Sequence, residues 1–406
     1  MDSQNQTDGR SIAGYLAVAL PVAIALGNFA SEAVLAAIAV LFVVRSVRES
    51  DFAWARQPWV AFALALWAYG VLRNGFMDTS WQSLGVSIAW VRFIIGAAAL
   101  ATWVLPDPLW RRRIVISGAA AVGFMAADAL LQYAIGRDII GRLPQSSRLT
   151  AEFPRPMVGI EIAWLFFPVL MGLLAERMTA QAAVFGAVCA AAILLSGERY
   201  ALLLAIAYFA CATLALARLR KAALWTVPAA AVILVAVYVL IPKTFQRQVT
   251  SSFAVASNLA DSPYGVIWAS ALRIAADHPV FGVGLNRYRD VCPDPKYGPE
   301  LAGPQHWPRC STHPHNIYLE WLTQTGAIGL IGFVAFAGAV LLRLGRRFRS
   351  DRSDLVFAGL AITIALRFWP LASSTSFFIA WSAVPLWFLI GWAMAIAGGP
   401  KAQGHA

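Results

Sequence analysis

The most regular feature of this sequence is a series of long apolar runs separated by mostly short polar connectors. A helix needs roughly 20 apolar residues to cross the hydrocarbon core of a bilayer, and most of these runs approach that length. They predict an all-α, polytopic membrane protein with about 12 transmembrane helices. The predicted spans are residues 11–28, 30–45, 57–72, 84–105, 114–135, 158–175, 179–197, 200–217, 222–242, 315–342, 355–371 and 377–397.

Composition supports lipid as the main solvent of this chain. Only 13% of the 406 residues are charged and 59% are hydrophobic, whereas a soluble domain carries roughly 25% charged residues. The formal net charge of +11 indicates anionic lipid headgroups as partners. Nucleic acid is the weaker interpretation, because no basic soluble domain is present to bind it. The polar start, MDSQNQTDGR, indicates a short tail followed directly by a span.

The distribution of basic residues predicts the orientation of the spans. Cytoplasmic connectors carry an excess of Lys and Arg, and placing the N-terminus inside puts the basic groups of the even-numbered connectors there. Both termini are then cytoplasmic, and the two long connectors, 136–157 and 243–314, lie outside. The chain is then expected to divide into helices 1–242, a long outer loop 243–314, helices 315–397 and a cytoplasmic tail 398–406. The inner basic groups are Arg45, Arg48, Arg56, Arg111, Arg112, Arg113, Arg218, Arg220, Lys221, Arg343, Arg346, Arg347, Arg349 and Arg352.

Basic residues also occur on the predicted outer side, where the same rule predicts few, so their presence there has to be explained. Salt bridges to nearby acidic residues are one explanation; a site for an anion such as phosphate is the other, because Arg binds phosphate oxygens through a planar, bidentate fork. The outer set is Arg137, Arg142, Arg148, Arg155, Arg199, Lys243, Arg247, Arg273, Arg287, Arg289, Lys296 and Arg309. From it we select Arg142, Arg155, Arg199, Arg287 and Arg289 as anion-binding candidates. Arg367, near the outer end of a span, is a further candidate.

The four cysteines divide by location. Cys189 and Cys211 lie in predicted spans, where packing is the expected role. Cys292 and Cys310 lie in the outer loop, where an oxidising compartment permits a disulfide, with two free thiols as the alternative. No CxxC spacing occurs, so we expect no metal site at these cysteines.

The segment STHPHNIYLEWLTQTGAIGL, residues 311–330, holds the most informative histidines. Pro314 fits the first position of a helix, which would put His313 at or near the N-cap and His315 in the first turn. A helix N-terminus attracts anions and keeps a histidine neutral, so one location could supply phosphate binding and a general base. The alternative is that both histidines cap the helix or face water. In the outer loop, Trp307 is an exception among the tryptophans, because most of the others fit an interfacial aromatic belt.

Three motifs together resemble the O-antigen ligase family, which shares them with O-antigen polymerases and bacterial O-oligosaccharyltransferases. They are His315-Asn316 followed after nine residues by Gly326-Ala327-Ile328-Gly329, the upstream HPVFGVGLNRY (278–288), and the turn SGERYALL (196–203). The single long outer loop before the third-last span is similar too. The chain departs from the family in having His-x-His-Asn, so His313 and His315 are both candidates for the catalytic position.

The resemblance implies transfer of a glycan from undecaprenyl diphosphate to the lipid A-core oligosaccharide at the periplasmic face of the inner membrane. It implies an inverting reaction without metal, nucleotide sugar or other cofactor. His313 or His315 would act as general base, and Arg199 with other outer arginines and Asn316 would bind substrate. An O-antigen polymerase and a protein O-oligosaccharyltransferase remain open, as does a lipid or solute transporter. The sequence predicts neither the sugars joined nor the oligomeric state.

Overall fold

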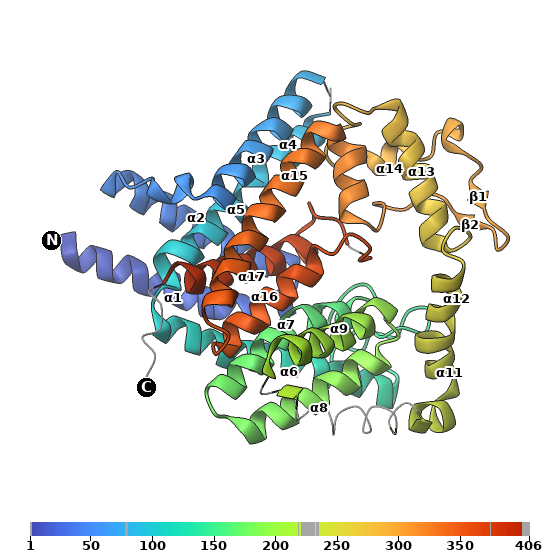
Figure 1. Ribbon diagram of the computed structural model, residues 1–406, viewed down its shortest axis with the longest axis horizontal. Coiled ribbons are helices and arrows are strands. Elements are labelled where there is room, and N and C mark those ends of the chain that lie inside the picture. Colours follow the sequence, from blue (N-terminus) through green and yellow to red (C-terminus); the bar gives the residue numbers. More distant parts are fainter. Residues whose placement is uncertain are drawn as a thin grey trace.

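A computed structural model describes residues 2–77, 80–217, 219–220, 232, 235–373 and 375–399, with side chains from residue 9 onward. The described chain is predominantly helical, and its only strands form one two-stranded hairpin (Figure 1). The all-α class expected from the apolar runs is confirmed. The elements are α1 (Asp2–Leu26), α2 (Asn28–Glu49), η1 (Ala53–Arg56), α3 (Pro58–Met77), α4 (Trp81–Ala89), α5 (Val91–Ala99), η2 (Leu100–Val104), α6 (Pro108–Ile135), α7 (Val158–Ala175), α8 (Thr179–Leu195), α9 (Arg199–Ala215), α11 (Pro242–Phe245), η3 (Gln246–Thr250), α12 (Ser251–Ser257), α13 (Pro263–Asp277), α14 (Tyr288–Val291), η4 (Pro295–Tyr297), β1 (Leu301–Ala302), β2 (Trp307–Pro308), α15 (Ile317–Ser350), α16 (Leu355–Arg367) and α17 (Ala380–Gly398).

The described helices cover most of eleven of the twelve predicted spans, although several helix ends differ from the predicted bounds. Eight helical stretches are long and apolar enough to cross a membrane, and three shorter apolar helices are α8, α9 and α16. One predicted span, 84–105, is built from α4, α5 and η2 in succession. The predicted span 222–242 and the tail 398–406 lie largely outside the described residues, as do Arg218 and Lys221.

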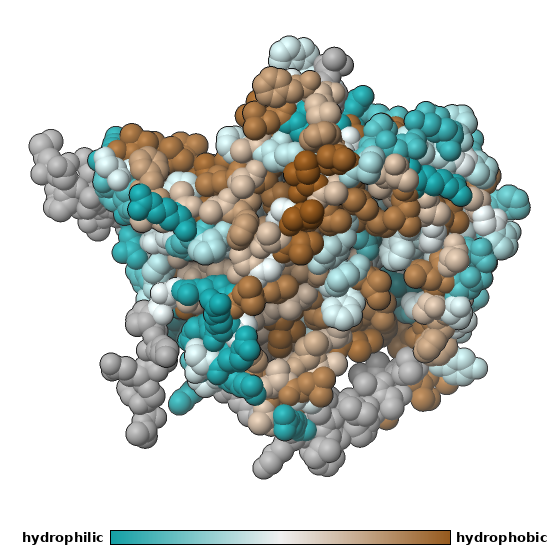
Figure 2. Space-filling view, turned by 45° about the horizontal axis from the view of Figure 1, so that its top comes forward, coloured by the Kyte–Doolittle hydropathy of each residue, from teal (hydrophilic) through white to brown (hydrophobic). Residues whose placement is uncertain are grey.

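Two helices form the centre of the bundle. Within the membrane-length windows, 94% of α17 and 89% of α7 is buried inside the protein, compared with 33% of α2, α3 and α15. These peripheral helices therefore present apolar faces outward, as lipid contact requires. Figure 2 shows the result on one face, where brown apolar side chains lie between teal polar groups.

Helix α15 is interrupted where the Gly-Ala-Ile-Gly motif lies. Gly326 has φ 67° and ψ −167°, which is non-helical. The carbonyls of Thr323 and Gln324 accept from Val283 N (2.9 Å) and Gly284 N (2.8 Å) instead of from their own helix. In return Ala327 N donates to Pro279 O (2.8 Å). Because an unpaired buried backbone group is costly, this exchange stabilises the break and fixes segment 279–284 against it.

The two motif glycines permit this close approach. A Cβ on Gly326 would overlap the backbone of Val280, and one on Gly282 would overlap the backbone of Gln324. Both glycines also have positive φ (67° and 65°), which other residues adopt at a cost. The HPVFGVGLNRY and Gly-Ala-Ile-Gly motifs therefore form one structural unit.

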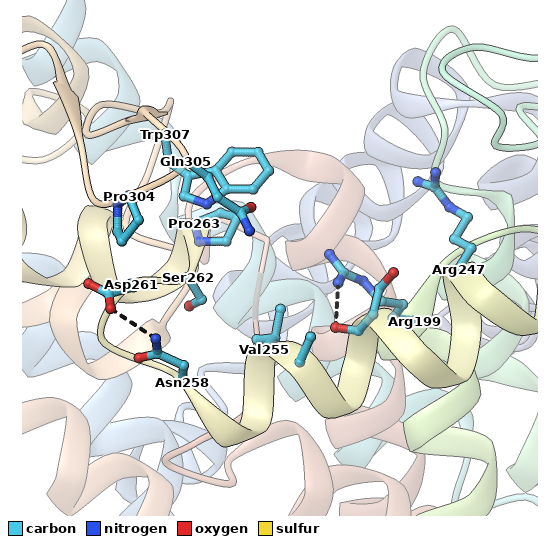
Figure 3. A pocket seen from close by; sticks show the side chains of 12 residues that line it. Arg199, Arg247, Val255, Asn258, Asp261, Ser262, Pro263, Pro304, Gln305 and Trp307 are labelled. Atoms are coloured by element: carbon cyan, nitrogen blue, oxygen red, sulfur yellow. Dashed lines mark hydrogen bonds between the residues drawn. The ribbon is translucent and has the colours of Figure 1, made fainter.

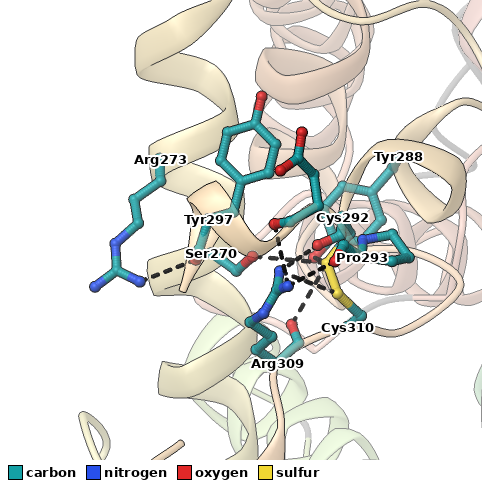
Figure 4. Close-up of a disulfide and its surroundings, with 9 residues drawn as sticks. Ser270, Arg273, Tyr288, Cys292, Pro293, Tyr297, Arg309 and Cys310 are labelled. Atoms are coloured by element: carbon teal, nitrogen blue, oxygen red, sulfur yellow. Dashed lines mark hydrogen bonds between the residues drawn. A yellow bond between two sulfur atoms is a disulfide. The ribbon is translucent and has the colours of Figure 1, made fainter. Parts of the chain in front are cut away.

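The segment 243–314, predicted to lie outside the membrane, has its own small core. Cys292 and Cys310 are joined by a disulfide with Cα atoms 5.7 Å apart (Figure 4). Beside it, the Arg309 guanidinium donates to the carbonyls of Cys292, Pro293 (2.9 Å) and Asp294 (3.1 Å). In Figure 1 this segment lies at the right, opposite the start of α1 at the left.

Candidate functional site

The turn between α8 and α9 is fixed by backbone contacts from three segments. Leu149 N donates to Ser196 O (3.0 Å), and the Glu198 carboxylate accepts from Gly159 N at the start of α7 (2.9 Å). Gly197 supplies the left-handed conformation of the turn, with φ 76°. Arg199 follows as the first residue of α9, and its guanidinium donates to Ser251 O on α12 (3.3 Å). The Ser-Gly-x-Arg turn thus positions this arginine.

Two further arginines join Arg199 at this turn. Arg247 on η3 donates through Nε to Gly197 O (2.8 Å) and through a terminal nitrogen to Ser146 O (3.3 Å). Burial, together with the charges of Arg148 and Arg199, lowers the pKa of Arg247. Burial also raises the pKa of Glu198 to about 7, against the opposing influence of Gly159 N–H and of Arg148. We call Arg148, Arg199 and Arg247 the arginine cluster.

Arg199 and Arg247 line a cavity of ≈ 440 Å³, here called the cationic cavity (Figure 3). Its floor is α12, and its far wall consists of residues that follow α12 and residues of the β1–β2 hairpin. In Figure 3 the two arginines lie at one end, and Trp307 with Gln305 at the other. The lining residues are Arg199, Arg247, Ser251, Ala254, Val255, Asn258, Asp261, Ser262, Pro263, Pro304, Gln305 and Trp307.

A second cavity of ≈ 540 Å³ also has Arg199 and residues of α12 in its lining and is here called the apolar cavity. Its walls come from α9, α12, α13, the end of α16 and the chain that follows α16. Arg199 and Val255 line both cavities, so the apolar cavity lies beside the arginine cluster. The other lining residues include Leu203, Leu204, Leu259, Trp268, Leu366, Trp369 and Leu371.

The histidines precede α15 and do not start it. The expectation that Pro314 opens the helix, with His313 at its N-cap, is wrong: α15 begins at Ile317 and Asn316 is its N-cap. The Asn316 side chain accepts from Tyr318 N (3.0 Å) and Leu319 N (3.1 Å). Asn is a stronger N-cap than His, and His315 has φ 55°, outside the helical region. Neither histidine therefore lies in the first helical turn.

The two imidazoles nevertheless lie together against the start of α13, where Ser262 and Pro263 line the cationic cavity and Tyr264 lines the apolar cavity. His313 is buried and its ring centroid is 4.3 Å from that of His315. Thr312 Oγ1 lies 3.0 Å from His313 Nδ1, and Ser311 Oγ lies 3.2 Å from His315 Nε2. His315 also packs edge-on against Tyr264, a lining residue of the apolar cavity, at 6.1 Å between ring centroids. The site thus contains a hydroxyl-supported histidine pair.

The first turn of α15 holds the chain between α16 and α17. Asn316 Nδ2 donates to Pro370 O (2.7 Å), and Tyr318 Oη donates to Phe368 O (2.7 Å). Buried Glu320 accepts from Phe377 N (2.8 Å). Because Trp369 and Leu371 line the apolar cavity, these contacts set one of its walls. Sequence motifs gave no indication of this role for Glu320.

The remaining sequence candidates lie elsewhere in the fold. Arg142 donates to Glu152 O within its own connector, and Arg155 is exposed. Arg287 pairs with Asp290 at 2.8 Å, and Arg289 lies 3.8 Å from the same carboxylate. Arg367 is buried, stacks over Trp164 at 3.8 Å and donates to Ser382 O (3.1 Å). None of these five lines either cavity, and their part in anion binding stays a prediction.

Sequence reasoning counted Arg148 and Arg247 among the outer arginines but did not select them. Only the folded turn brings them to Arg199, from connectors 136–157 and 243–314. Among the described residues, no group of three or more His, Cys, Asp or Glu side chains is arranged to hold a metal ion.

Fold and site together define a multi-pass, α-helical membrane protein with a cationic cavity and an apolar cavity that meet at one arginine. Residues 183–334 match the family described as O-Antigen ligase, a range that contains all three sequence motifs. The match supports membership of the O-antigen ligase family, whose members are glycosyltransferase-like membrane enzymes that act on lipid-linked glycans. A search of curated proteins finds no matching relative.

Proposed function

We propose that this protein transfers O-antigen glycan from undecaprenyl diphosphate to the lipid A-core oligosaccharide, with inversion at the anomeric carbon. The observation that carries the proposal is the position of Arg199 between the cationic and the apolar cavity. A polyprenyl diphosphate has the same two-part chemistry, an anionic head joined to a long apolar chain. The family match supports an activity of this kind in lipopolysaccharide assembly.

The arginine cluster would hold the diphosphate. Arg199 and Arg247 hydrogen-bond to main-chain carbonyls, which carry no net charge, so their positive charges are not neutralised by these contacts. Preorganised cations stabilise a diphosphate leaving group as negative charge develops on it. The apolar cavity beside Arg199 would receive the first isoprenoid units.

The histidine pair would supply the general base. In the proposed step, His313 or His315 takes the proton of the acceptor hydroxyl, and that oxygen attacks the anomeric carbon. The bond from this carbon to the diphosphate oxygen breaks, and the diphosphate leaves with the electron pair. Ser311 and Thr312 contact the imidazoles and would orient them. Such help contributes roughly 10²–10⁴-fold to the rate.

The test is a reconstituted transfer assay with the full-length protein and undecaprenyl-diphosphate glycan as donor. Three acceptors are offered separately: core lipid, a second lipid-linked glycan and a pilin-like protein. We expect transfer to the core lipid, and we expect Arg199→Ala and the double variant His313→Ala/His315→Ala each to lower it by roughly 10²-fold or more. Arg48→Ala, on α2, is the control and should transfer normally.

Each result has a distinct consequence. Transfer only to a second lipid-linked glycan would identify a polymerase, and transfer only to the pilin-like protein an O-oligosaccharyltransferase. A double histidine variant with normal transfer would remove the base assignment. Flipping or uptake without transfer would establish a transporter instead.

A further inference from the structure

The end of the cationic cavity away from the arginines has a different chemistry. The β1–β2 hairpin carries Gln305 and Trp307 onto one wall, and Asn258 and Asp261 follow α12 on the other (Figure 3). Asn258 Nδ2 donates to Asp261 Oδ2 (2.9 Å), which fixes both side chains in the wall. Trp307 is only partly buried, so part of its ring faces the cavity.

The length of α12 separates this end of the cavity from the arginines by about the width of one small chemical group. Arg199 contacts Ser251, the first residue of α12, and Asn258 follows its last residue. At a rise of 1.5 Å per residue the seven-residue helix spans about 10 Å. A diphosphate held at Arg199 and Arg247 would therefore present its substituent to Trp307, Gln305 and Asp261.

The side chains at this end indicate which chemical group, attached to a bound diphosphate, would fit there. The Asp261 carboxylate opposes a further phosphate, and three polar side chains disfavour a hydrocarbon chain. A sugar ring fits both features, since its C–H face can pack on an indole and its hydroxyls donate and accept. Asn258 and Gln305 each offer a donor and an acceptor, and Asp261 offers acceptors.

We propose that Trp307, with Gln305, Asn258 and Asp261, forms the subsite that recognises the sugar attached to the diphosphate of the donor. This inference rests on the proposed function, because it requires a diphosphate at the arginine cluster. According to this inference, the β1–β2 hairpin determines which sugar the donor can carry.

The hairpin is held firmly enough for this role. Arg309, next to β2, donates through its main-chain nitrogen to Glu300 O (3.1 Å) and through its guanidinium to three carbonyls beside the disulfide. The register pairs Leu301 with Pro308 and Ala302 with Trp307. A recognition surface fixed before binding loses little conformational entropy when the ligand arrives.

The test measures binding of two kinds of probe to the full-length protein in nanodiscs. One probe is undecaprenyl diphosphate; the others carry a single hexose, N-acetylhexosamine or deoxyhexose on that diphosphate. We expect the wild type to bind at least one sugar-bearing probe more tightly than the bare lipid. Trp307→Ala should reduce that preference about five- to tenfold and leave affinity for the bare lipid unchanged. Trp307→Phe should retain most of the preference.

Trp81→Ala, an exposed tryptophan on α4 outside both cavities, is the matched control and should behave as the wild type. A Trp307→Ala protein that keeps its preference would overturn the inference, as would equal loss of affinity for both kinds of probe. Equal affinity of the wild type for bare and sugar-bearing lipids would overturn it too, while the proposed function would stand. Binding of neither probe by the wild type would overturn the proposed function itself.

Discussion

At the scale of single residues, the arginine cluster is an arrangement of like charges held by neutral acceptors. Arg199 and Arg247 donate to the carbonyls of Ser251 and Gly197. Glu198 lies among these arginines, yet burial raises the pKa of its carboxyl to about 7. A carboxyl that is partly protonated at neutral pH neutralises only part of the positive charge of the arginine cluster. The remaining positive charge favours an anionic ligand.

This pKa predicts how stability varies with pH. A Glu198 pKa raised from 4.5 to about 7 means that the folded state binds the proton more tightly than the unfolded chain. The stability that protonation of Glu198 contributes to the folded state is therefore fully present below pH 4.5 and is lost as pH rises through about 7. Glu198→Gln stays neutral and retains the Oε1 acceptor for Gly159 N–H, so it should flatten the decline of Tm over this interval. Thermal unfolding of both proteins in detergent at several pH values measures this dependence of Tm on pH.

Glu300→Gln, at an exposed carboxylate of the outer segment, is the control and should reproduce the wild-type curve. A Glu198→Gln curve parallel to that of the wild type would contradict the assignment.

The sequence could predict individual members of the site but not their grouping. His315-Asn316 and Arg199 are identified by motif, because each lies in a short local pattern. Arg148 and Arg247 belong to no such pattern. Arg247 reaches the turn through hydrogen bonds to the carbonyls of Gly197 and Ser146, which depend on the tertiary fold. The start of α15 was misplaced because Pro314 is a local helix signal that the Asn316 cap overrides.

At the scale of elements, the apolar runs predicted helices well because lipid contact leaves few alternatives to an internally hydrogen-bonded backbone. The break in α15 was not predicted. Nothing in the run TQTGAIGL is strongly helix-breaking, and Gly326 is non-helical only because segment 279–284 supplies substitute hydrogen bonds. The hydroxyl of Tyr69 on α3 donates to Thr325 O (2.7 Å) and so adds a third element to this unit.

Gly326→Ala tests the importance of the break. A non-glycine residue at this φ and ψ, a combination that is essentially restricted to glycine, costs roughly 1–3 kcal/mol. The added Cβ would also overlap the Val280 backbone. We expect a loss of about 2 kcal/mol or more in stability and faster proteolysis within 243–314. Differential scanning fluorimetry and limited proteolysis of the reconstituted protein provide the measurements.

Gly338→Ala is the matched control, since Gly338 lies in the same helix with no atom within 4 Å of an added Cβ. It should be neutral or stabilising by up to about 1 kcal/mol. Equal stability of the two variants would mean that the break is not what holds segment 279–284 in place.

At the scale of the whole molecule, both cavities involve the outer segment 243–314, and the start of α1 lies at the opposite end of the molecule (Figure 1). At such a site the proposed lipid-linked donor and membrane-anchored acceptor would meet without leaving the bilayer surface. This arrangement fits the proposed orientation, with termini in the cytoplasm and both long connectors in the periplasm of a bacterial inner membrane. The Cys292–Cys310 disulfide fits it as well, since structural disulfides persist in oxidising compartments.

Thiol labelling tests the orientation directly. Arg155 and Asp277 are exposed on the two proposed periplasmic connectors, and Arg48 and Arg352 are exposed on proposed cytoplasmic ones. Single cysteines at Arg155 and Asp277 should react with a membrane-impermeant maleimide in intact spheroplasts, because the reagent reaches only the outer face. Cysteines at Arg48 and Arg352 should react only after permeabilisation, and the unsubstituted chain supplies the background from Cys189 and Cys211. The reverse pattern would place the arginine cluster and the histidine pair in the cytoplasm, where a periplasmic acceptor cannot reach them, and the proposed transfer would then be impossible.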